Sequence, residues 1–90
     1  MAIAVVFNPP AMTVAQYDEA IRRLEAAGAG SPEGRTYHVC FGPSDKLQVF
    51  DLWESQAAFD AFGETLLPIL AEVGLDAGQP QVLDVRNILR

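Results

Sequence analysis

The 90-residue sequence is poor in the residue types that build several common kinds of site. It contains one cysteine, Cys40, and one histidine, His38. A lone cysteine forms no disulfide within the chain, and one histidine falls short of the three protein ligands that a catalytic zinc usually has. The glycine-rich segment 28–34 lacks the lysine of a phosphate-binding loop. We therefore expect neither a metal nor a cofactor.

Basic residues are also scarce, with 6 Lys and Arg against 12 Asp and Glu and a formal net charge of −6. Binding to nucleic acid needs a basic stripe that displaces counterions, so we expect no nucleic-acid partner. The N-terminal apolar run ends at Asn8 and has no basic residue before it, which is too short for a membrane span or a secretory signal. These features predict a cytoplasmic protein with no membrane partner.

Apolar residues, in contrast, are plentiful and make up 50% of the sequence. We expect one domain over residues 1–90, and a chain of this length buries only about 60 to 65 per cent of the surface that its unfolded form exposes. The remaining apolar surface needs a partner subunit or a ligand to cover it, because large exposed apolar patches promote association.

The hydrophobic pattern predicts alternating strands and helices. Strands are expected over residues 2–8, 35–41, 47–53 and 81–89. A helix should follow the capping box of Thr13 and Gln16, and a second should run from about Gln56, after the cap residue Ser55, to Val73. Pro68 should kink or break this second helix between Gly63 and Pro68, since an internal proline costs about 3 kcal/mol.

The order strand, helix, strand, strand, helix, strand is the ferredoxin-like βαββαβ pattern. It predicts an α+β protein with a four-stranded antiparallel sheet and two helices on one face. With a four-residue loop at 43–46, His38 lies opposite Asp51 and Cys40 opposite Val49. A loop one residue shorter or longer would separate His38 from Asp51, because a slip of one residue exchanges the faces.

The side chains should divide between the two faces of the sheet by simple alternation. We expect the helices to cover the face that carries Tyr37, Val39, Phe41, Phe50 and Leu52. The other face, with Cys40, Leu47, Val49 and Trp53, would then be uncovered, and Thr36 would share the face of His38 and Cys40. Such an apolar open face predicts a homodimer formed through the sheet.

Three segments together resemble a known family. They are TYHVCFG (36–42), VFDLWESQAAFDAF (49–62) and LLPIL (66–70). In these segments and in element order, the chain resembles the dimeric α+β barrel proteins, in particular the small proteins grouped with the antibiotic biosynthesis monooxygenases. The resemblance implies a homodimer and a pocket for a small molecule. Relatives include oxygenases that use neither metal nor flavin on aromatic substrates, haem-degrading enzymes, isomerases and many proteins without an assigned activity.

His38 and Asp51 are the candidate catalytic residues. On the preferred register Asp51 fixes the tautomer of His38, which could then act as a general base. The alternative is a histidine that is hydrogen-bonded for structural reasons alone. The chain lacks the Asn, Trp and His arrangement of haem-degrading relatives, which argues against haem as a ligand.

Larger side chains on the same elements are candidates for contact with a substrate. A flat aromatic molecule could stack on Trp53, although large aromatics more often serve packing. Cys40 lacks a partner that would activate it, which favours an inert buried thiol. The candidate substrate-binding residues are Tyr17, Cys40, Val49, Trp53, Phe59 and Phe62.

Two functions from different classes are compatible with this sequence. The first is a monooxygenase-like enzyme that binds a small apolar or aromatic molecule, with His38 removing a proton so that the resulting carbanion reacts with oxygen. The second is a non-catalytic dimer that binds a small ligand or serves as an assembly module. The single histidine leaves both hypotheses open.

Overall fold

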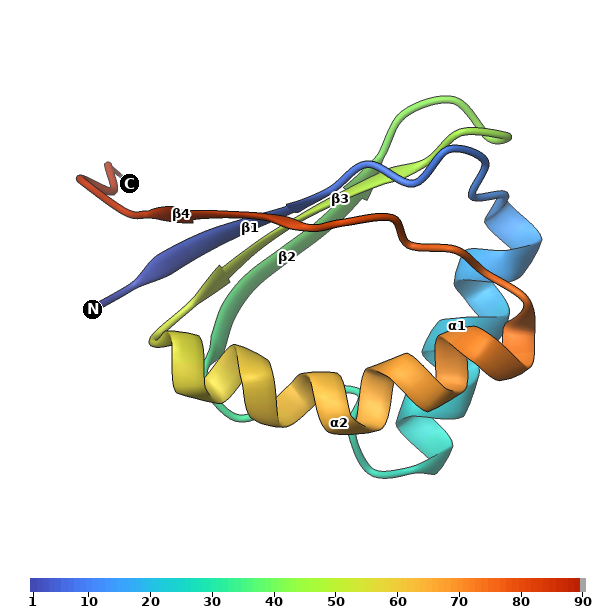
Figure 1. Ribbon diagram of the computed structural model, residues 1–90, viewed down its shortest axis with the longest axis horizontal. Helices are drawn as coiled ribbons and strands as arrows, with labels where there is room; N and C mark the ends of the chain where they lie inside the picture. Colours follow the sequence, from blue (N-terminus) through green and yellow to red (C-terminus); the bar gives the residue numbers. More distant parts are fainter. Residues whose placement is uncertain (90) are drawn as a thin grey trace.

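The computed structural model describes residues 1–89 and consists of one antiparallel sheet with both helices on the same side (Figure 1). The strand order is β2-β3-β1-β4. This is the ferredoxin-like βαββαβ arrangement that the sequence predicts. The elements are β1 (Ile3–Phe7), α1 (Val14–Ala26), β2 (Arg35–Phe41), β3 (Gln48–Trp53), α2 (Gln56–Val73) and β4 (Gln81–Asp84).

Both helices begin at the residues that the capping signals predict. The Thr13 hydroxyl accepts a hydrogen bond from the Gln16 backbone N–H at 3.2 Å, and the Gln16 side chain accepts one from the Thr13 backbone N–H at 3.0 Å. The Ser55 hydroxyl accepts the Ala58 N–H at 3.1 Å. These bonds satisfy N–H groups that have no partner within the first turn of a helix.

The second helix is continuous through Pro68, so the alternative of a break between Gly63 and Pro68 is wrong, and the alternative of a kink there stays a prediction. Pro68 itself is exposed, whereas Ile69 and Leu70 are buried directly after it. Burial of an aliphatic side chain contributes about 1.5 to 3 kcal/mol. Packing on the inner side of the helix therefore offsets the cost of the proline. Gly74, with φ of 73°, takes the left-handed conformation that ends the helix.

The last strand is shorter than the predicted range 81–89. Its pairing with β1 runs from Val6↔Gln81 to Ile3↔Asp84, and the Val85 N–H then donates to the Ala2 carbonyl at 3.0 Å. Because β1 itself begins at Ile3, residues 86–89 have no strand of their own sheet to pair with. The partner strand, rather than the apolar pattern of the C-terminal segment, sets this boundary.

The predicted hairpin register is confirmed, with His38 opposite Asp51 and Cys40 opposite Val49. The predicted assignment of the faces is wrong. The helices cover the side of Asp51 and Trp53, which are 2% and 0% exposed, while Tyr37 and Phe41 are 52% and 43% exposed on the other side. Both faces are apolar in sequence, so hydrophobicity alone does not determine which one the helices cover.

A β-bulge at the start of β2 changes the alternation of its first residues. Arg35 pairs with Trp53 and Tyr37 with Leu52, so Thr36 is the extra residue. Arg35 thereby takes the face of His38 that simple alternation gives to Thr36, and Thr36 is exposed. Within residues 1–89 no helix is both long enough and apolar enough to cross a membrane.

Candidate functional site

A cavity of about 70 Å³ lies between the covered face of the sheet and the two helices. Only four of the residues that line it are polar or charged: Tyr17, Arg35, His38 and Asp51. The rest of its wall is apolar. The apolar lining residues are Phe7, Pro9, Met12, Ala20, Ile21, Leu24, Val49, Phe62, Leu66, Leu70, Leu75 and Ala77. A few converging polar groups in an apolar cavity are typical of a small-molecule site.

Three of the polar side chains form a continuous hydrogen-bonded chain. His38 Nδ1 lies 2.5 Å from Asp51 Oδ1, and His38 Nε2 lies 2.6 Å from the Tyr17 hydroxyl. A carboxylate only accepts hydrogen bonds, so Nδ1 carries the proton that it donates to Asp51. Nε2 is then the acceptor of the Tyr17 O–H. The order Tyr17, His38, Asp51 therefore fixes one tautomer of the imidazole ring.

Each member of this chain comes from a different element. Tyr17 lies on the first turns of α1, His38 on β2 and Asp51 on β3. The capping box orients α1, and the hairpin register brings His38 opposite Asp51. The Tyr17 and His38 rings are nearly parallel, with centroids 6.1 Å apart. Three separate elements thus hold the hydrogen-bonded side chains of Tyr17, His38 and Asp51 in place.

Burial raises the pKa of Tyr17 above its ordinary value of 10.0. The negative charges of ionised Cys40, Asp51 and Asp18 raise this pKa further, and the positive charge of Arg35 opposes them. A phenol with a raised pKa stays protonated at neutral pH. Tyr17 can therefore donate its hydrogen bond to His38 throughout the physiological range.

Arg35 is the charged cavity-lining residue that the sequence does not predict. Its Nη2 donates to the Gly30 carbonyl at 3.1 Å, and its guanidinium lies 5.9 Å from the centre of the Phe62 ring. Among residues 1–89 no carboxylate lies within ion-pair distance of it; the ion pairs there involve Arg22, Arg23 and His38. No periodicity could have identified Arg35, because only the bulge brings it to the covered face.

The structure brings together some of the predicted site residues and separates others. Tyr17, His38, Val49, Asp51 and Phe62 line the cavity. Their roles in binding and catalysis stay predictions.

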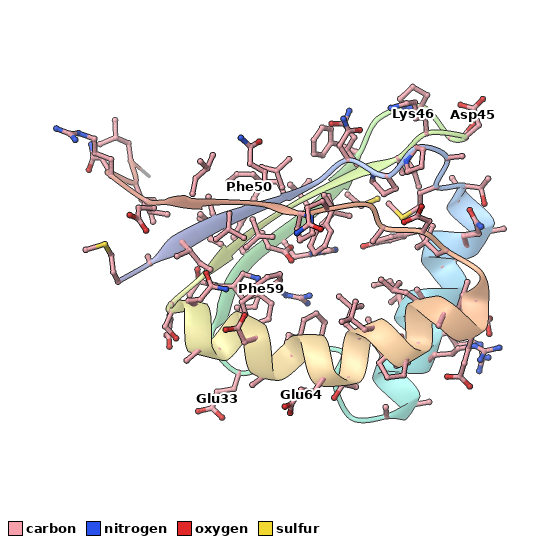
Figure 2. The ribbon with its side chains drawn as sticks, viewed as in Figure 1. Glu33, Asp45, Lys46, Phe50, Phe59 and Glu64 are labelled. Atoms are coloured by element: carbon pink, nitrogen blue, oxygen red, sulfur yellow. The ribbon has the colours of Figure 1, made fainter. Side chains whose placement is uncertain are left out.

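Trp53, Phe59 and Cys40 lie outside the residues that line the cavity. The Trp53 ring is 0% exposed and its centroid is 5.6 Å from that of Phe59 and 5.2 Å from that of Phe62. Figure 2 shows Phe59 directed from α2 towards the sheet. Cys40 packs against the cluster of Met12, Leu47 and Val49. In this structure, these three residues pack in the core beside the cavity.

The thiol of Cys40 also lacks the electrostatic environment of a nucleophile. Burial raises its pKa, and the negative charge of Asp18 raises it further. A reactive cysteine needs the opposite shift, because the thiolate is the nucleophile. The structure thus agrees with the interpretation of Cys40 as an inert thiol.

No protein-family model and no curated protein matches the chain. Solved structures do. SnoaB, a cofactor-independent oxygenase from Streptomyces nogalater, is 16% identical, with a TM-score of 0.64 over 98% of this chain and 94% of SnoaB. A Caulobacter crescentus protein, provisionally named an antibiotic biosynthesis monooxygenase, is 20% identical, with a TM-score of 0.70 over 96% of this chain and 91% of the other. A Shewanella loihica protein, provisionally named a monooxygenase, is 21% identical, with a TM-score of 0.58 over 97% and 96%.

The chain has the ferredoxin-like fold of the antibiotic biosynthesis monooxygenase-like proteins. The likeness extends over nearly the whole length of each chain, which agrees with the resemblance that the sequence motifs indicate. Because the sequences are only 16% to 21% identical, the likeness establishes the arrangement of the backbone and not a shared function. One fold of this kind carries many unrelated activities, so the function has to be argued from the site itself.

Proposed function

We propose that this protein is a homodimeric, monooxygenase-like enzyme that oxidises a small apolar or aromatic molecule without a cofactor. The observation that carries the proposal is the Tyr17–His38–Asp51 chain in the wall of an apolar cavity. Cofactor-independent oxygenation requires a base that removes a proton from carbon, and a histidine oriented by a carboxylate is suited to that task. The fold that the chain shares with a cofactor-independent oxygenase also supports this proposal.

The hydrogen bonds suggest how the proton moves. His38 Nε2 is occupied by the Tyr17 hydroxyl, so a ligand proton reaches it through Tyr17. The Tyr17 oxygen accepts the proton from the ligand carbon while its own proton passes to Nε2. The imidazolium that results is stabilised by the buried carboxylate of Asp51, as in other histidine–carboxylate pairs. Tyr17 ends the step neutral, which suits a phenol whose pKa is raised.

The oxidant in this proposal is molecular oxygen. The carbanion reduces oxygen to a peroxide anion on the same carbon, and this anion takes the proton back from the His38 imidazolium through Tyr17 to give the hydroperoxide. Loss of water from that hydroperoxide, with the second hydrogen of the carbon, leaves a carbonyl group. One methylene group and one O₂ molecule thus give one carbonyl group and one water molecule, with no other reductant. The protein supplies the base and a cavity with a mainly apolar wall.

The dimension of the cavity restricts the ligand. Its volume of about 70 Å³ is less than half of the roughly 150 Å³ apolar cavity known to bind benzene. Tyr17, Arg35, Leu75 and Ala77 in its wall are only partly buried, so a ligand can extend towards the surface. We therefore propose a ligand with one ring rather than a fused polycyclic system.

The test measures proton removal and oxygen consumption separately. Single-ring ketones and phenols with an acidic C–H group are incubated with the protein in D₂O, with NMR recording deuterium exchange and an electrode recording oxygen uptake. His38→Ala should slow the exchange at least about 100-fold, the usual contribution of a general base. Tyr37→Phe, on the exposed side of the same strand, is the matched control and should leave both rates unchanged.

The outcome also decides between catalysis and simple binding. Exchange and oxygen uptake that both depend on His38 support the proposal. Ligands that bind in the cavity without exchange or oxygen uptake would refute the enzyme and leave the non-catalytic binding module, for which the apolar lining of the cavity is the favourable observation.

A further inference from the structure

The cavity wall contains a positive charge that the proposed proton relay does not use. Arg35 lines the cavity, and within residues 1–89 the only hydrogen bond of its side chain goes from Nη2 to the Gly30 carbonyl. The carboxylate of Asp51, which also lines the cavity, is already engaged with His38. A guanidinium has five N–H donors, so most of those of Arg35 are available.

The local backbone is arranged so that Arg35 reaches this position. Without the bulge at Thr36, the alternation of β2 would direct Arg35 to the open face with Tyr37. Gly34, which precedes it, has φ of 91°, and a Cβ there would lie 2.6 Å from the Cβ of Ala58. Both the bulge and the glycine disfavour a regular strand, and bulges commonly redirect a side chain next to a functional site.

A charge in an apolar wall favours a ligand with the opposite charge. A partly buried cation beside apolar side chains loses part of its hydration, and a group of opposite charge compensates that loss. The Phe62 ring, 5.9 Å from the guanidinium, offers only a weak cation–π contact. An anionic oxygen on the ligand would provide the missing partner, and it would do so most strongly where water is excluded.

We infer that the ligand of this cavity carries a carbonyl oxygen conjugated with the carbon that loses its proton, and that Arg35 binds this oxygen as the enolate or phenolate anion that results. The inference rests on the proposed function and narrows its substrate class. Removal of the proton by the Tyr17–His38 relay moves negative charge onto the conjugated oxygen. Arg35 then stabilises the charge that develops in the transition state, as the donors of an oxyanion hole do.

Two probe molecules of nearly the same shape test this directly. 4-Nitrophenol has an ionisable oxygen and gives a yellow phenolate, whereas 4-nitrotoluene has a methyl group in its place. Calorimetry measures the affinity of each, and absorbance measures the ionisation of bound 4-nitrophenol. We expect the wild type to bind 4-nitrophenol at least tenfold more tightly than 4-nitrotoluene. We also expect it to hold the phenolate at a pH where the free compound is mostly protonated.

Variants of Arg35 separate this role from a structural one. Arg35→Gln should bind 4-nitrotoluene as the wild type does but lose both the tenfold preference and the yellow shift, and Arg35→Lys should recover part of both. Arg22→Gln removes a positive charge from the outer surface of α1 and should retain both. A preference that survives in Arg35→Gln, or equal affinity of the wild type for the two probes, would overturn the inference and leave the proposed function standing. Failure of the wild type to bind either probe would overturn both.

Discussion

Both faces of the sheet are rich in apolar residues, but they differ in the polar side chains that they carry. The covered face combines buried apolar residues with Arg35, His38 and Asp51. The hydrogen bonds from Asp51 to His38 and from His38 to Tyr17 connect this face to α1. The open face consists mainly of exposed or half-buried apolar side chains. Its residues include Ala4, Val6, Tyr37, Val39, Phe41, Phe50, Leu52 and Leu83.

The difference in polar content indicates that the two faces bury apolar surface for different purposes. On the covered face the polar residues lie at defined positions within a core, where an unsatisfied polar group would be costly. The hydrogen bonds of His38 to Asp51 and to Tyr17 offset that cost for these three residues and make the face suitable for chemistry. On the open face, Tyr37, Phe41 and Leu83 are 52%, 43% and 49% exposed, and no such polar cluster is found within residues 1–89. A surface of that kind favours a second protein rather than a small ligand.

The largest effect should come from matched truncations of an aromatic residue on each face. Trp53→Ala removes a side chain that is 0% exposed, and we expect the free energy of unfolding to fall by about 3 to 5 kcal/mol. Phe41→Ala removes one that is 43% exposed, and at low protein concentration we expect a loss below about 1 kcal/mol. Urea denaturation measures both. Similar losses at the two positions would contradict the assignment of the faces.

The next largest effect should come from a substitution on the open face that weakens association of two chains. Figure 2 shows Phe50 on the side of the sheet away from the helices. We expect light scattering to give about twice the chain mass for the wild type. Phe50→Asp should raise the dissociation constant at least 100-fold, which is about 2.8 kcal/mol, because it buries a charge in an apolar contact.

The same charge placed elsewhere provides the control for this association experiment. Ala15→Asp adds an aspartate to the exposed surface of α1 and should leave the mass of the wild type unchanged. A wild type that is monomeric at micromolar concentration would refute the proposed homodimer, and an unchanged mass for Phe50→Asp would exclude the open face as its interface.

Local signals in the sequence predict most of the fold. The capping residues Thr13 and Ser55 fix where the helices begin, and the loop of the β2–β3 hairpin fixes the pairing of His38 with Asp51. These features depend on neighbouring residues, so a single sequence contains them. The length of β4 depends instead on where its distant partner β1 begins, and the apolar pattern overestimates it.

The site is less predictable because two of its features are tertiary. The hydrogen bond from Tyr17 to His38 joins a helix to a strand 21 residues further along the chain. Tyr17 appeared in the sequence analysis only as a candidate for ligand contact, since the docking of α1 on the sheet decides which polar group it meets. Arg35 was missed because a single extra residue at the bulge reverses its face. Periodicity cannot detect such an insertion.

The smallest effect should come from the hydroxyl that links the two layers. Tyr17→Phe removes the donor to His38 Nε2 and should reduce the free energy of unfolding by about 1 kcal/mol at neutral pH. Because the pKa of Tyr17 is raised in the folded protein, the native state keeps this proton at pH values where the unfolded chain loses it. Stability that depends on Tyr17 is therefore present below about pH 10 and declines as the pH rises above it.

Comparison with the exposed tyrosine on the other face isolates this contribution from other groups that titrate in alkali. At low protein concentration, where the open face is uncovered, Tyr37→Phe should show the same alkaline decline in stability as the wild type, since it removes a hydroxyl from a side chain that is 52% exposed. Tyr17→Phe should show a shallower decline, because it lacks the group that the native state holds protonated. Denaturation curves between pH 7 and about 11 measure the two slopes. Equal slopes for the two variants would mean that the Tyr17 hydroxyl is in effect solvated, and the relay from the cavity to His38 would then lose its first member.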